Sequence, residues 1–319
     1  MSDNKYDVII IGGGAAGMTA AIYTSRKGLR TAIISQDLGG QMSMTNEIEN
    51  YPGVELTSGP DLVNRFRAQA EKFGAEIFLN QVTDVAAIDS GFKVSTSTAE
   101  YVALAVILAF GLTPRSLGVP GEDKFKGRGV SFCATCDAPF YKNKVVAVVG
   151  GGNSALEAVE ELSGVATKVY LIHRNDSFRA EQILIDRLKT LPNVEVLMQS
   201  AIEEFEGETK LKSVVVRDLT GTKTDFELTV DGVFLEIGYI TKTDWLKNLV
   251  DLNERGEIAI NAKAETSRAG LFAAGDVTTL LYKQIVISAG EGAKAALSAA
   301  QYIAKTTGRI APPDWGKRK

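Results

Sequence analysis

The chain has 319 residues, enough for two domains of ordinary size, with 45% apolar and 23% charged residues as in an average soluble globular protein. No apolar run approaches the ~20 residues of a membrane-spanning helix, and the polar N-terminus lacks the pattern of a secretory signal, so we expect a cytoplasmic protein that does not bind a membrane. The net charge of −4 argues against nucleic acid as a partner, because such a partner requires a basic face.

The first predicted element is a buried strand at Tyr6–Ile11, a nearly continuous apolar run that suits a parallel strand covered on both faces. It leads into the sequence GGGAAG at Gly12–Gly17 and then into a helical stretch. Strand, G-x-G-x-x-G turn and helix in this order form a dinucleotide-binding fingerprint. Gly12 permits the tight turn, Gly14 lets a pyrophosphate approach the backbone, and Gly17 lets the helix pack on the strand.

The second strand of this unit is predicted at Thr31–Ile34 and is followed by Ser35-Gln36-Asp37. An acidic residue usually binds the ribose directly after this strand, and none stands at that position. We therefore expect the Asp37 carboxylate or backbone groups to make the ribose contacts.

The two cysteines of the chain, Cys133 and Cys136, have the C-x-x-C spacing. A structural zinc site needs four ligands, usually cysteine or histidine, and the chain has one histidine, so we expect no metal site. In a reducing compartment such a pair favours redox chemistry, because one of its thiols usually has a lowered pKa.

Reduction of a disulfide needs a proton donor for the leaving thiolate. Asp137 directly follows Cys136, and burial there would raise the pKa of its carboxyl toward the working pH. A helix N-cap or turn residue is the alternative role for Asp137, and the sequence leaves both open.

A second dinucleotide-binding fingerprint begins at the buried strand Lys144–Val149. The strand leads into GGGNSA at Gly150–Ala155 and a helix, with alanine as a tolerated variant of the third glycine. Two such units in one chain predict two bound dinucleotides.

The ribose-binding position of the second unit follows a strand predicted at Lys168–Ile172 and falls on His173 and Arg174, with Arg179 nearby. Basic residues here indicate a 2′-phosphate, so NADPH is the expected nucleotide.

Farther along the chain, a short strand is predicted at Leu271–Ala274, and it ends in Gly275-Asp276. A long helix over Ile285–Ile303 follows it, and the positive N-terminal end of that helix could stabilise charge on a reduced flavin.

These motifs, taken in order, make the chain similar to the low-molecular-weight, bacterial-type thioredoxin reductases over nearly its whole length. The shared landmarks are GGGAAG at Gly12–Gly17, GGQ at Gly39–Gln41, ENYPG at Glu49–Gly53, CATCD at Cys133–Asp137, GGGNSA at Gly150–Ala155, H-R-x-x-x-x-R at His173–Arg179, GLFAAGDV at Gly270–Val277 and Lys-Gln-Ile at Lys283–Ile285.

The resemblance implies an α/β fold with two Rossmann-like dinucleotide-binding domains, the second inserted in the first. The FAD-binding domain would comprise residues 1–115 and 245–319, and the NAD(P)H-binding domain with the C-x-x-C pair residues 116–244. A homodimer is also implied.

The family's mechanism would pass electrons from NADPH to FAD, from FAD to the disulfide, and from the dithiol to thioredoxin or a thioredoxin-like protein. Cys136 would face the flavin and Cys133 would attack thioredoxin. One domain would rotate against the other about connections near 113–118 and 238–243 between the half-reactions.

The remaining site residues follow from the landmarks. The residues expected to bind FAD are Gly12, Gly14, Ala15, Gly17, Gln41, Asn50, Gly275, Asp276, Lys283, Gln284 and Ile285. Those expected to bind NADPH are Gly150, Gly152, Asn153, Ser154, Ala155, His173, Arg174 and Arg179.

Three positions depart from the family's pattern. Asn175 replaces the second arginine of the usual Arg-Arg, which weakens the preference for NADPH and opens the site to NADH. Lys283 stands where arginine is usual, and Ala109-Phe110-Gly111 replaces the usual Ala-Thr-Gly. The peroxide-linked reductases of the same branch carry an extra N-terminal domain with its own cysteine pair, which this sequence does not include.

Other activities compatible with a flavin and a dithiol are a reductase with a different electron donor (NADH, ferredoxin or a deazaflavin), a small-molecule dithiol oxidase, and a redox sensor without turnover. The second nucleotide fingerprint and its two arginines favour the NADPH-dependent thioredoxin-disulfide reductase.

Overall fold

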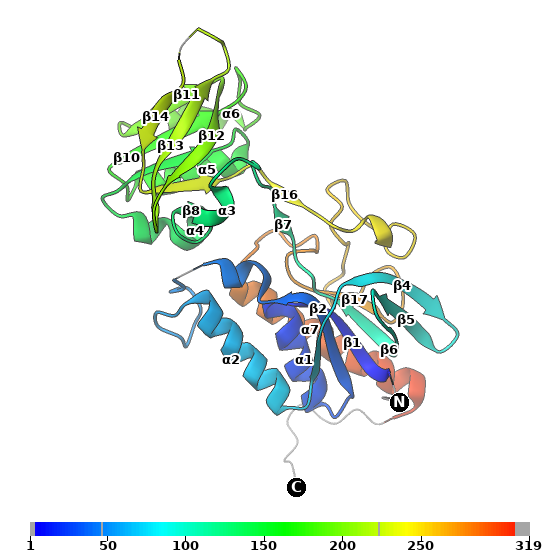
Figure 1. Cartoon of the computed structure of the whole chain (residues 1–319). Coiled ribbons are helices and arrows are strands. Elements are labelled where there is room, and N and C mark those ends of the chain that lie inside the picture. The colour runs from blue at the N-terminus through cyan, green and yellow to red at the C-terminus, as the bar shows by residue number, and fades with distance from the viewer. Residues whose placement is uncertain (1–3, 46, 223, 310–319) are drawn as a thin grey trace. The chain divides into compact units, whose positions relative to one another are not determined.

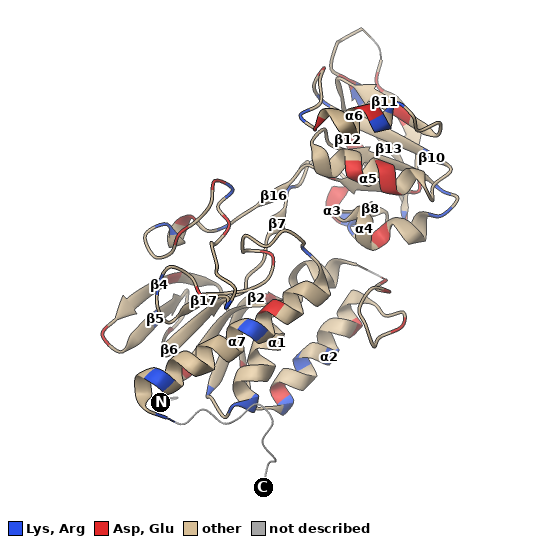
Figure 2. Ribbon diagram, turned by 180° about the vertical axis from the view of Figure 1, so that it is seen from behind, with Lys and Arg blue, Asp and Glu red and all other residues tan. Residues whose placement is uncertain are grey.

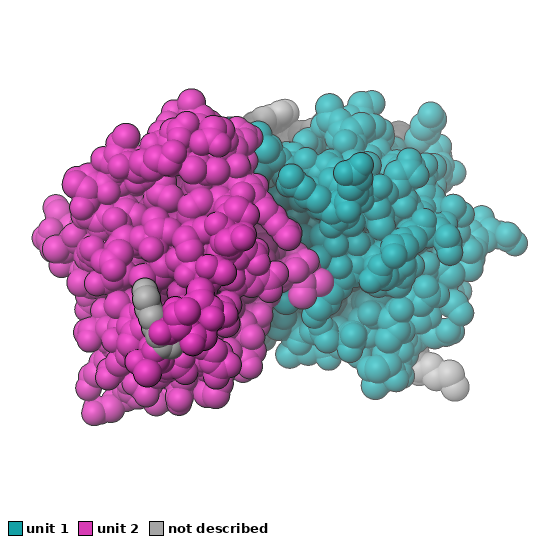
Figure 3. Space-filling view, turned by 90° about the horizontal axis from the view of Figure 1, so that it is seen from above, with its two compact units in different colours: residues 1–43, 51–113, 241–319 teal, residues 44–50, 114–240 magenta. Residues whose placement is uncertain are grey.

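A computed structural model describes residues 4–45, 47–222 and 224–309 (Figure 1). The chain forms two compact units, coloured separately in Figure 3. The first unit comprises Met1–Ser43, Tyr51–Thr113 and Thr241–Lys319, and the second comprises Met44–Asn50 and Pro114–Ile240. Within the described part of the chain, none of the helices combines the length and apolar character that crossing a membrane requires.

The first unit is built on a seven-stranded sheet with the order β3-β2-β1-β6-β5-β4 and with β17 paired to β6. The pairs among β3, β2, β1, β6 and β17 are parallel, whereas β4, β5 and β6 form an antiparallel extension. The strands are β1 (Lys5–Gly13), β2 (Thr31–Leu38), β3 (Glu76–Leu79), β4 (Val82–Ile88), β5 (Gly91–Thr96), β6 (Glu100–Leu108) and β17 (Leu271–Ala273).

Strand β1 lies in the middle of this sheet because its apolar residues can be covered on both faces. Val8, Ile9 and Ile10 have no exposed surface, as the continuous apolar run predicts. The helical elements of the unit are α1 (Ala15–Arg26), η1 (Gly40–Met44), α2 (Gly59–Lys72), η3 (Asp244–Leu246) and α7 (Ile285–Thr307).

Helix α7 packs closely against α1, with no space for a side chain between the two backbones at Gly292. A Cβ atom on Gly292 would lie 2.1 Å from the carbonyl oxygen of Ala16. This contact holds α7 against the beginning of α1, directly behind the first glycine-rich loop.

The second unit contains a five-stranded parallel sheet and a separate three-stranded antiparallel sheet. The parallel sheet has the order β11-β10-β9-β15-β8, with β11 (Val194–Met198), β10 (Lys168–His173), β9 (Val145–Val149), β15 (Gly232–Leu235) and β8 (Val130–Ser131). The antiparallel sheet contains β12 (Ser200–Gly207), β13 (Leu211–Asp218) and β14 (Phe226–Thr229). The helical elements are α3 (Glu122–Phe125), α4 (Ala134–Asp137), η2 (Ala138–Tyr141), α5 (Asn153–Ser163) and α6 (Gln182–Leu188).

Strand β9 marks the point where the order of the parallel sheet reverses, because β10 follows on one side and β15 lies on the other. In open α/β sheets, ligands bind beyond the carboxyl ends of the strands at this place. The loop Gly150–Gly152 after β9 and Glu236 after β15 both lie there.

Apart from both ends of the segment Met44–Asn50, the chain passes between the two units at 113–114 and 240–241, and these two places are neighbours in space. Strands β7 (Thr113–Pro114) and β16 (Tyr239–Ile240) pair with each other, and the Arg115 amide donates a hydrogen bond to the Gly238 carbonyl at 3.0 Å.

Candidate active site

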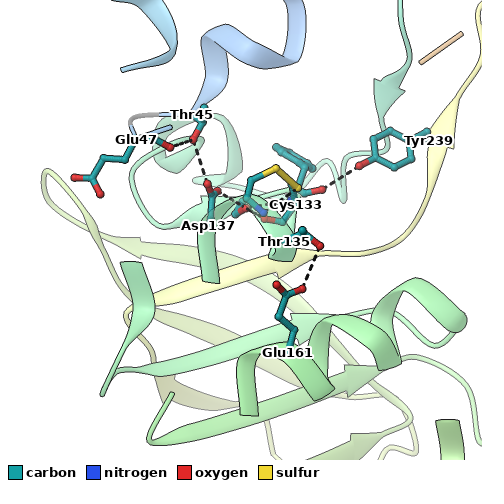
Figure 4. The surroundings of a disulfide bond; sticks show 10 residues. Thr45, Glu47, Cys133, Thr135, Asp137, Glu161 and Tyr239 are labelled. Carbon is teal, nitrogen blue, oxygen red and sulfur yellow. Dashed lines mark hydrogen bonds between the residues drawn. A yellow bond between two sulfur atoms is a disulfide. The ribbon is translucent and has the colours of Figure 1, made fainter. Parts of the chain in front are cut away.

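Cys133 and Cys136 are joined by a disulfide in the second unit (Figure 4), as their spacing predicts. Cys133 is the N-cap of the short helix α4, and the Cys136 amide donates a hydrogen bond to the Cys133 sulfur at 3.2 Å. Both residues are half-buried. An amide aimed at the Cys133 sulfur would stabilise a thiolate there after reduction.

Asp137 ends α4, and its carboxylate accepts two hydrogen bonds from hydroxyl groups. The Ser131 hydroxyl donates to Oδ2 at 2.6 Å and the Thr45 hydroxyl donates to Oδ1 at 3.1 Å. Burial raises the pKa of the Asp137 carboxyl above its ordinary value, while both hydroxyls oppose that shift. A raised pKa is what a proton donor beside the disulfide requires.

Ser131 connects Asp137 to the disulfide. Its hydroxyl oxygen accepts a hydrogen bond from the Cys133 amide at 3.1 Å while its proton points to Asp137. One buried hydroxyl group thus links the backbone of Cys133 to the Asp137 carboxyl.

Thr45 belongs to the segment Met44–Asn50, whose sequence position is in the middle of the first unit. Its contacts nevertheless assign it to the second unit. The Thr45 hydroxyl lies within hydrogen-bonding distance of two acceptors, Asp137 and the Glu47 carbonyl, the latter at 3.2 Å. The position of this segment beside Asp137 was not expected from the sequence.

A hollow of about 800 Å³ lies beside Asp137 in the second unit. Its lining includes Ser131 and Asp137 together with the cations Arg128, Lys144 and Lys210. Residues 150–152 of the second glycine-rich loop do not line this hollow.

The second glycine-rich loop has the form that a dinucleotide requires. Gly150 has φ +155°, and a Cβ atom there would lie 2.5 Å from the Glu236 carbonyl oxygen. A Cβ atom on Gly152 would meet nothing within 4 Å, so space for a phosphate remains directly before the first residue of α5, Asn153. Ala155 is buried behind the loop and Ser154 is exposed.

His173 lies beneath this loop. Its imidazole is 6% exposed, stacks on the Phe178 ring with centroids 5.3 Å apart, and pairs with the Ser177 carbonyl through Nε2 at 3.0 Å. A Cβ atom on Gly151 would lie 2.1 Å from the ring. His173 therefore supports the loop from below, and its expected contribution to NADPH binding would be made through the loop.

Arg174 and Arg179 are both exposed, and the Arg179 amide donates to the Gly151 carbonyl at 2.7 Å. Asn153 fixes the same segment from α5: its side chain donates to Glu181 Oε1 at 3.1 Å and accepts from the Glu181 amide at 2.9 Å. The two guanidinium groups are thus carried by a segment that is fastened to the glycine-rich loop.

The first glycine-rich loop has the same design. A Cβ atom on Gly12 would lie 2.3 Å from the Ala109 carbonyl oxygen, and one on Gly17 would lie 1.9 Å from the Gly12 carbonyl oxygen. Gly14 faces open space, with its nearest neighbour at 3.8 Å, and it precedes Ala15, the first residue of α1. The three positions match the roles that the fingerprint assigns, so the residues present fit an FAD pyrophosphate.

Asp276 is the half-buried carboxyl group expected to contact the FAD. It follows Gly275, which has φ +76°, and Oδ1 accepts a hydrogen bond from the Ser288 hydroxyl at 2.9 Å. Burial raises the pKa of Asp276, and Ser288 and Lys283 oppose that shift. A carboxylate so placed can accept further hydrogen bonds from hydroxyl groups of a ligand.

The Lys283 ammonium binds three other groups of the protein. Its ammonium donates to the carbonyls of Asp276 at 3.0 Å and Thr278 at 2.6 Å, and it forms an ion pair with Glu257 at 3.1 Å. In this position Lys283 orders the loop after Asp276, so its expected role along the FAD would be an indirect one.

The other residues expected to contact the FAD are Gln41, Asn50, Asp37, Gln284 and Ile285. Gln41 donates its side-chain amide to the Leu112 carbonyl at 3.0 Å. Asn50 is exposed at the end of the segment Met44–Asn50, and Asp37 accepts a hydrogen bond from the Gly40 amide at 3.0 Å. Gln284 is the N-cap of α7 and Ile285 its first residue.

The sequence reasoning missed Ser131, Thr45 and Glu236. No pattern marks the first two, because their roles depend on the side chain of Asp137. Glu236 could have been found, since it follows a buried strand at the carboxyl edge of the sheet. Over residues 4–45, 47–222 and 224–309, histidine, cysteine and acidic side chains form no group that could hold a metal ion.

The chain is similar over nearly its whole described length to known disulfide reductases. The model of the family described as pyridine nucleotide-disulphide oxidoreductase matches residues 6–306. The crystal structure of thioredoxin reductase from Streptococcus pyogenes has a TM-score of 0.90 at 38% identity, covering 95% of this chain and 100% of that one. For thioredoxin reductase from Giardia duodenalis the TM-score is 0.87 at 36% identity, covering 94% and 99%.

Curated relatives have a different name, the F subunit of alkyl hydroperoxide reductase. The chain is 41% identical over 307 residues to the protein of that name in Pseudomonas putida and 40% identical over 310 residues to the one in Escherichia coli strain K12. Each match covers 95% of this chain and 59% of the relative. The chain therefore spans about three fifths of the length of these relatives. Together the likenesses confirm the predicted α/β fold with two Rossmann-like domains and the resemblance to thioredoxin reductases.

Proposed function

Because the chain belongs to the pyridine nucleotide-disulphide oxidoreductase family, we propose that it is a thioredoxin-disulfide reductase that uses NADPH and FAD. The observation that carries this proposal is the Cys133–Cys136 disulfide with Asp137 beside it, in the same unit as the second dinucleotide-binding loop. FAD would occupy the first unit and NADPH the second, and the enzyme would act as a cytoplasmic homodimer.

A bound FAD would accept a hydride from the nicotinamide and supply two electrons to the disulfide. The loops after β1 and β9, with open space at Gly14 and Gly152, would hold the two pyrophosphates at the N-termini of α1 and α5. Asp276 would fix the ribityl end of the FAD.

Reduction breaks the bond between the two sulfurs and adds two electrons and two protons. Cys136 would be the sulfur that receives the electrons, and Cys133 would leave as a thiolate. The Cys136 amide would stabilise that thiolate, and Asp137 would supply its proton. Asp137 would then take that proton back, and the Cys133 thiolate would attack the disulfide of the thioredoxin-like protein. Cys136 would resolve the resulting mixed disulfide.

Arg174 and Arg179 support NADPH as the electron donor, since both are exposed on the segment fastened to Gly151. Asn175 supplies no positive charge, so we expect the preference for NADPH over NADH to be smaller than three basic residues would give.

Domain rotation is part of the proposal. The passages at 113–114 and 240–241 pair through β7 and β16, so a rotation could be absorbed in part at this short ladder. The passages at both ends of Met44–Asn50 would have to move with it.

The curated relatives suggest a second candidate, in which the dithiol delivers electrons to a system that reduces alkyl hydroperoxides. The two candidates share every step up to the dithiol and differ in the protein that Cys133 attacks.

Anaerobic titration of the FAD-loaded protein with NADPH and, separately, with NADH tests the proposal. We expect NADPH to bleach the flavin at low concentration and two thiols to appear at Cys133 and Cys136. An Arg179→Ala variant should need about tenfold more NADPH, with its response to NADH unchanged. If neither nucleotide bleaches a flavin that dithionite reduces, the proposed donor is wrong. Turnover with thioredoxin, or with a peroxide-reducing disulfide protein in its place, then separates the two candidates.

A further inference from the structure

Lys283 joins the turn between β17 and α7 to a carboxylate from an earlier part of the chain. The turn, residues 275–278, contains Asp276, the carboxyl group expected to contact the FAD. The Lys283 ammonium donates to the carbonyls of Asp276 at 3.0 Å and Thr278 at 2.6 Å and forms an ion pair with Glu257. The three N–H bonds of the ammonium group thus match three acceptors, two of them in the turn.

Glu257 is held in the position that this ion pair requires. Its Oε1 atom lies 3.1 Å from Lys283 Nζ, and its Oε2 atom accepts a hydrogen bond from the Asn253 side-chain amide at 2.8 Å. The backbone is fixed at the same place, because the Glu257 amide donates to Asn253 Oδ1 at 2.9 Å and the Ile258 amide donates to the Val277 carbonyl at 2.9 Å. Glu257 is therefore bonded on both sides and presents one carboxylate oxygen to the lysine.

The ion pair of Glu257 and Lys283 is largely shielded from solvent. The Glu257 side chain is 12% exposed and the Lys283 side chain is 23% exposed. Such a pair depends on both partners, because removal of one leaves the other as a desolvated charge without a counter-charge. Lys283 therefore needs Glu257 in order to keep its ammonium group in the turn.

The beginning of α7 increases this need for a counter-charge. Lys283 directly precedes Gln284, the N-cap of α7, and the N-terminal end of a helix has a partial positive charge. The first turn of α7 contains no acidic residue, so the helix itself offers no anion there. The charged residues of α7, coloured in Figure 2, lie beyond this turn at Glu291, Lys294 and Lys305. Glu257 thus supplies the negative charge that the start of α7 lacks.

We propose that Glu257 is a positioning residue for the FAD, and that it acts through Lys283 on the turn that contains Asp276. Glu257 holds the ammonium group, the ammonium group holds two carbonyls of the turn, and the turn directs the Asp276 carboxylate to the ligand. The proposal rests on the proposed function, because it takes FAD as the ligand of the first unit. Neither the electron donor nor the thioredoxin-like protein enters the argument.

The affinity of the full chain for FAD tests this role. The FAD-loaded protein is diluted, free flavin is separated by ultrafiltration, and the dissociation constant is obtained from the amount released. We expect Glu257→Gln to bind FAD about tenfold more weakly than wild type does, because glutamine keeps the shape of the side chain but lacks the charge that holds Lys283. An unchanged dissociation constant in a folded Glu257→Gln protein would overturn the proposal.

Glu265→Gln is the matched control, because residues 261–265 repeat the arrangement of residues 253–257. The Asn261 side chain donates to Glu265 Oε2 at 2.7 Å, and its Oδ1 atom accepts the Glu265 amide at 3.1 Å. Glu265 is half-buried like Glu257, but its carboxylate is not among the three groups that bind Lys283. The dissociation constant of this control should stay within about twofold of the wild-type value. An equal weakening in both variants would mean that Glu257 has no specific role.

A second background shows whether Glu257 acts through Lys283. Lys283→Met should weaken FAD binding by about tenfold or more, because the two carbonyls of the turn lose a charged donor. Adding Glu257→Gln to this variant should not weaken binding further by more than about twofold, since the ammonium group that Glu257 holds is already gone. A further tenfold loss in the double variant would refute the route through Lys283.

An Asp276→Asn background separates positioning of the FAD from a general effect on stability. If Glu257 acts by directing the Asp276 carboxylate, its replacement matters less once that carboxylate has lost its charge. Glu257→Gln should then cost about threefold or less in FAD affinity, compared with about tenfold in the wild-type background. An undiminished tenfold cost would mean that the FAD is weakened by loosening of the fold, and the positioning role would be wrong.

Light acetylation of the folded, FAD-loaded wild-type protein gives a second measurement, should Glu257→Gln fail to fold. Acetylation removes the charge of a lysine and its ability to form an ion pair. Mass spectrometry of the flavin-free and flavin-bound fractions should find acetylated Lys283 enriched in the flavin-free fraction, whereas acetylation of the exposed Lys263 should be equal in both. Equal acetylation of Lys283 in the two fractions would overturn the proposal. A wild-type protein that binds no FAD at all would instead contradict the proposed function.

Discussion

Two opposing effects act on the pKa of the Asp137 carboxyl. Burial raises this pKa because it favours the neutral form, whereas two hydroxyl groups lower it because they favour the charged form. Ser131 and Thr45 donate to different oxygens of the group, so each can be removed separately. Ser131 also accepts the Cys133 amide, whereas Thr45 makes no hydrogen bond to the redox pair itself. A substitution at Thr45 therefore changes the pKa of Asp137 without removing a hydrogen bond to Cys133, which a substitution at Ser131 would do.

Thr45→Val should raise the pKa of Asp137, because it removes a donor to the carboxylate at nearly constant volume. If Asp137 donates a proton, the rate of disulfide reduction falls as the pH rises through this pKa. The alkaline limb of the pH profile should then move to higher pH by less than about one unit. Stopped-flow measurement of dithiol formation checks this, with Thr45→Ser as the control whose limb stays in place.

Replacing the acid itself gives a separate expectation. Asp137→Asn should slow reduction by about 10²-fold or more and abolish the alkaline limb, because an amide has no proton to give. A variant that keeps both the wild-type rate and the limb would show that Asp137 has only the turn or cap role.

At the scale of elements, helix α7 contains two glycines in different surroundings. Gly292 is pressed against the Ala16 carbonyl of α1, whereas a Cβ atom on Gly290 would meet nothing within 4 Å. The first permits a close helix crossing behind the FAD loop, and the second only makes the backbone more flexible in the unfolded chain.

Gly292→Ala should destabilise the protein by about 1–3 kcal/mol, because the new methyl group must push α7 away from α1. The displacement would also loosen the loop before α1, so the FAD content of the purified protein should fall. Gly290→Ala is the internal control and should stabilise the protein by roughly 0.5–1 kcal/mol. Urea unfolding and the ratio of flavin to protein absorbance measure both effects, and equal stability of the two variants would contradict the packing argument.

Local pattern predicted the two glycine-rich loops, the strands before them and the redox pair. Each of these depends on neighbours within a few residues, such as the buried run before Gly12 or the spacing of Cys133 and Cys136. Contacts that join distant segments were not predictable. Thr45 reaches Asp137 across 92 positions, and Lys283 forms an ion pair with Glu257. The contribution of His173 to NADPH binding stays a prediction, and the packing of its ring beneath Gly151 is a contact that the motif does not indicate.

At the scale of the whole molecule, the proposed cycle requires rotation of one unit against the other between the two half-reactions. The peptide links that would carry this motion lie at the β7–β16 ladder and at both ends of the segment Met44–Asn50. Large collective motions of this kind take place in microseconds to milliseconds and often limit turnover.

Turnover should therefore depend on the viscosity of the solvent. We expect kcat with thioredoxin to fall nearly in proportion to relative viscosity in sucrose, because sucrose slows the rotation. A large polymer that raises only the bulk viscosity is the control and should have little effect. If sucrose leaves kcat unchanged, rotation does not limit the cycle.

The paired crossings also bear on how such a chain could have arisen. Since the main segment of the second unit, Pro114–Ile240, leaves and re-enters the first unit at adjacent strands, the two ends of this segment lie as close together as the ends of a hairpin loop. A host fold accommodates an insertion of any length at such a place, because only a surface turn is replaced and its own sheet remains unbroken. The architecture is thus the one expected if the gene segment for a nucleotide-binding module had been inserted into a turn of a second nucleotide-binding module. The inserted module contains the cysteine pair.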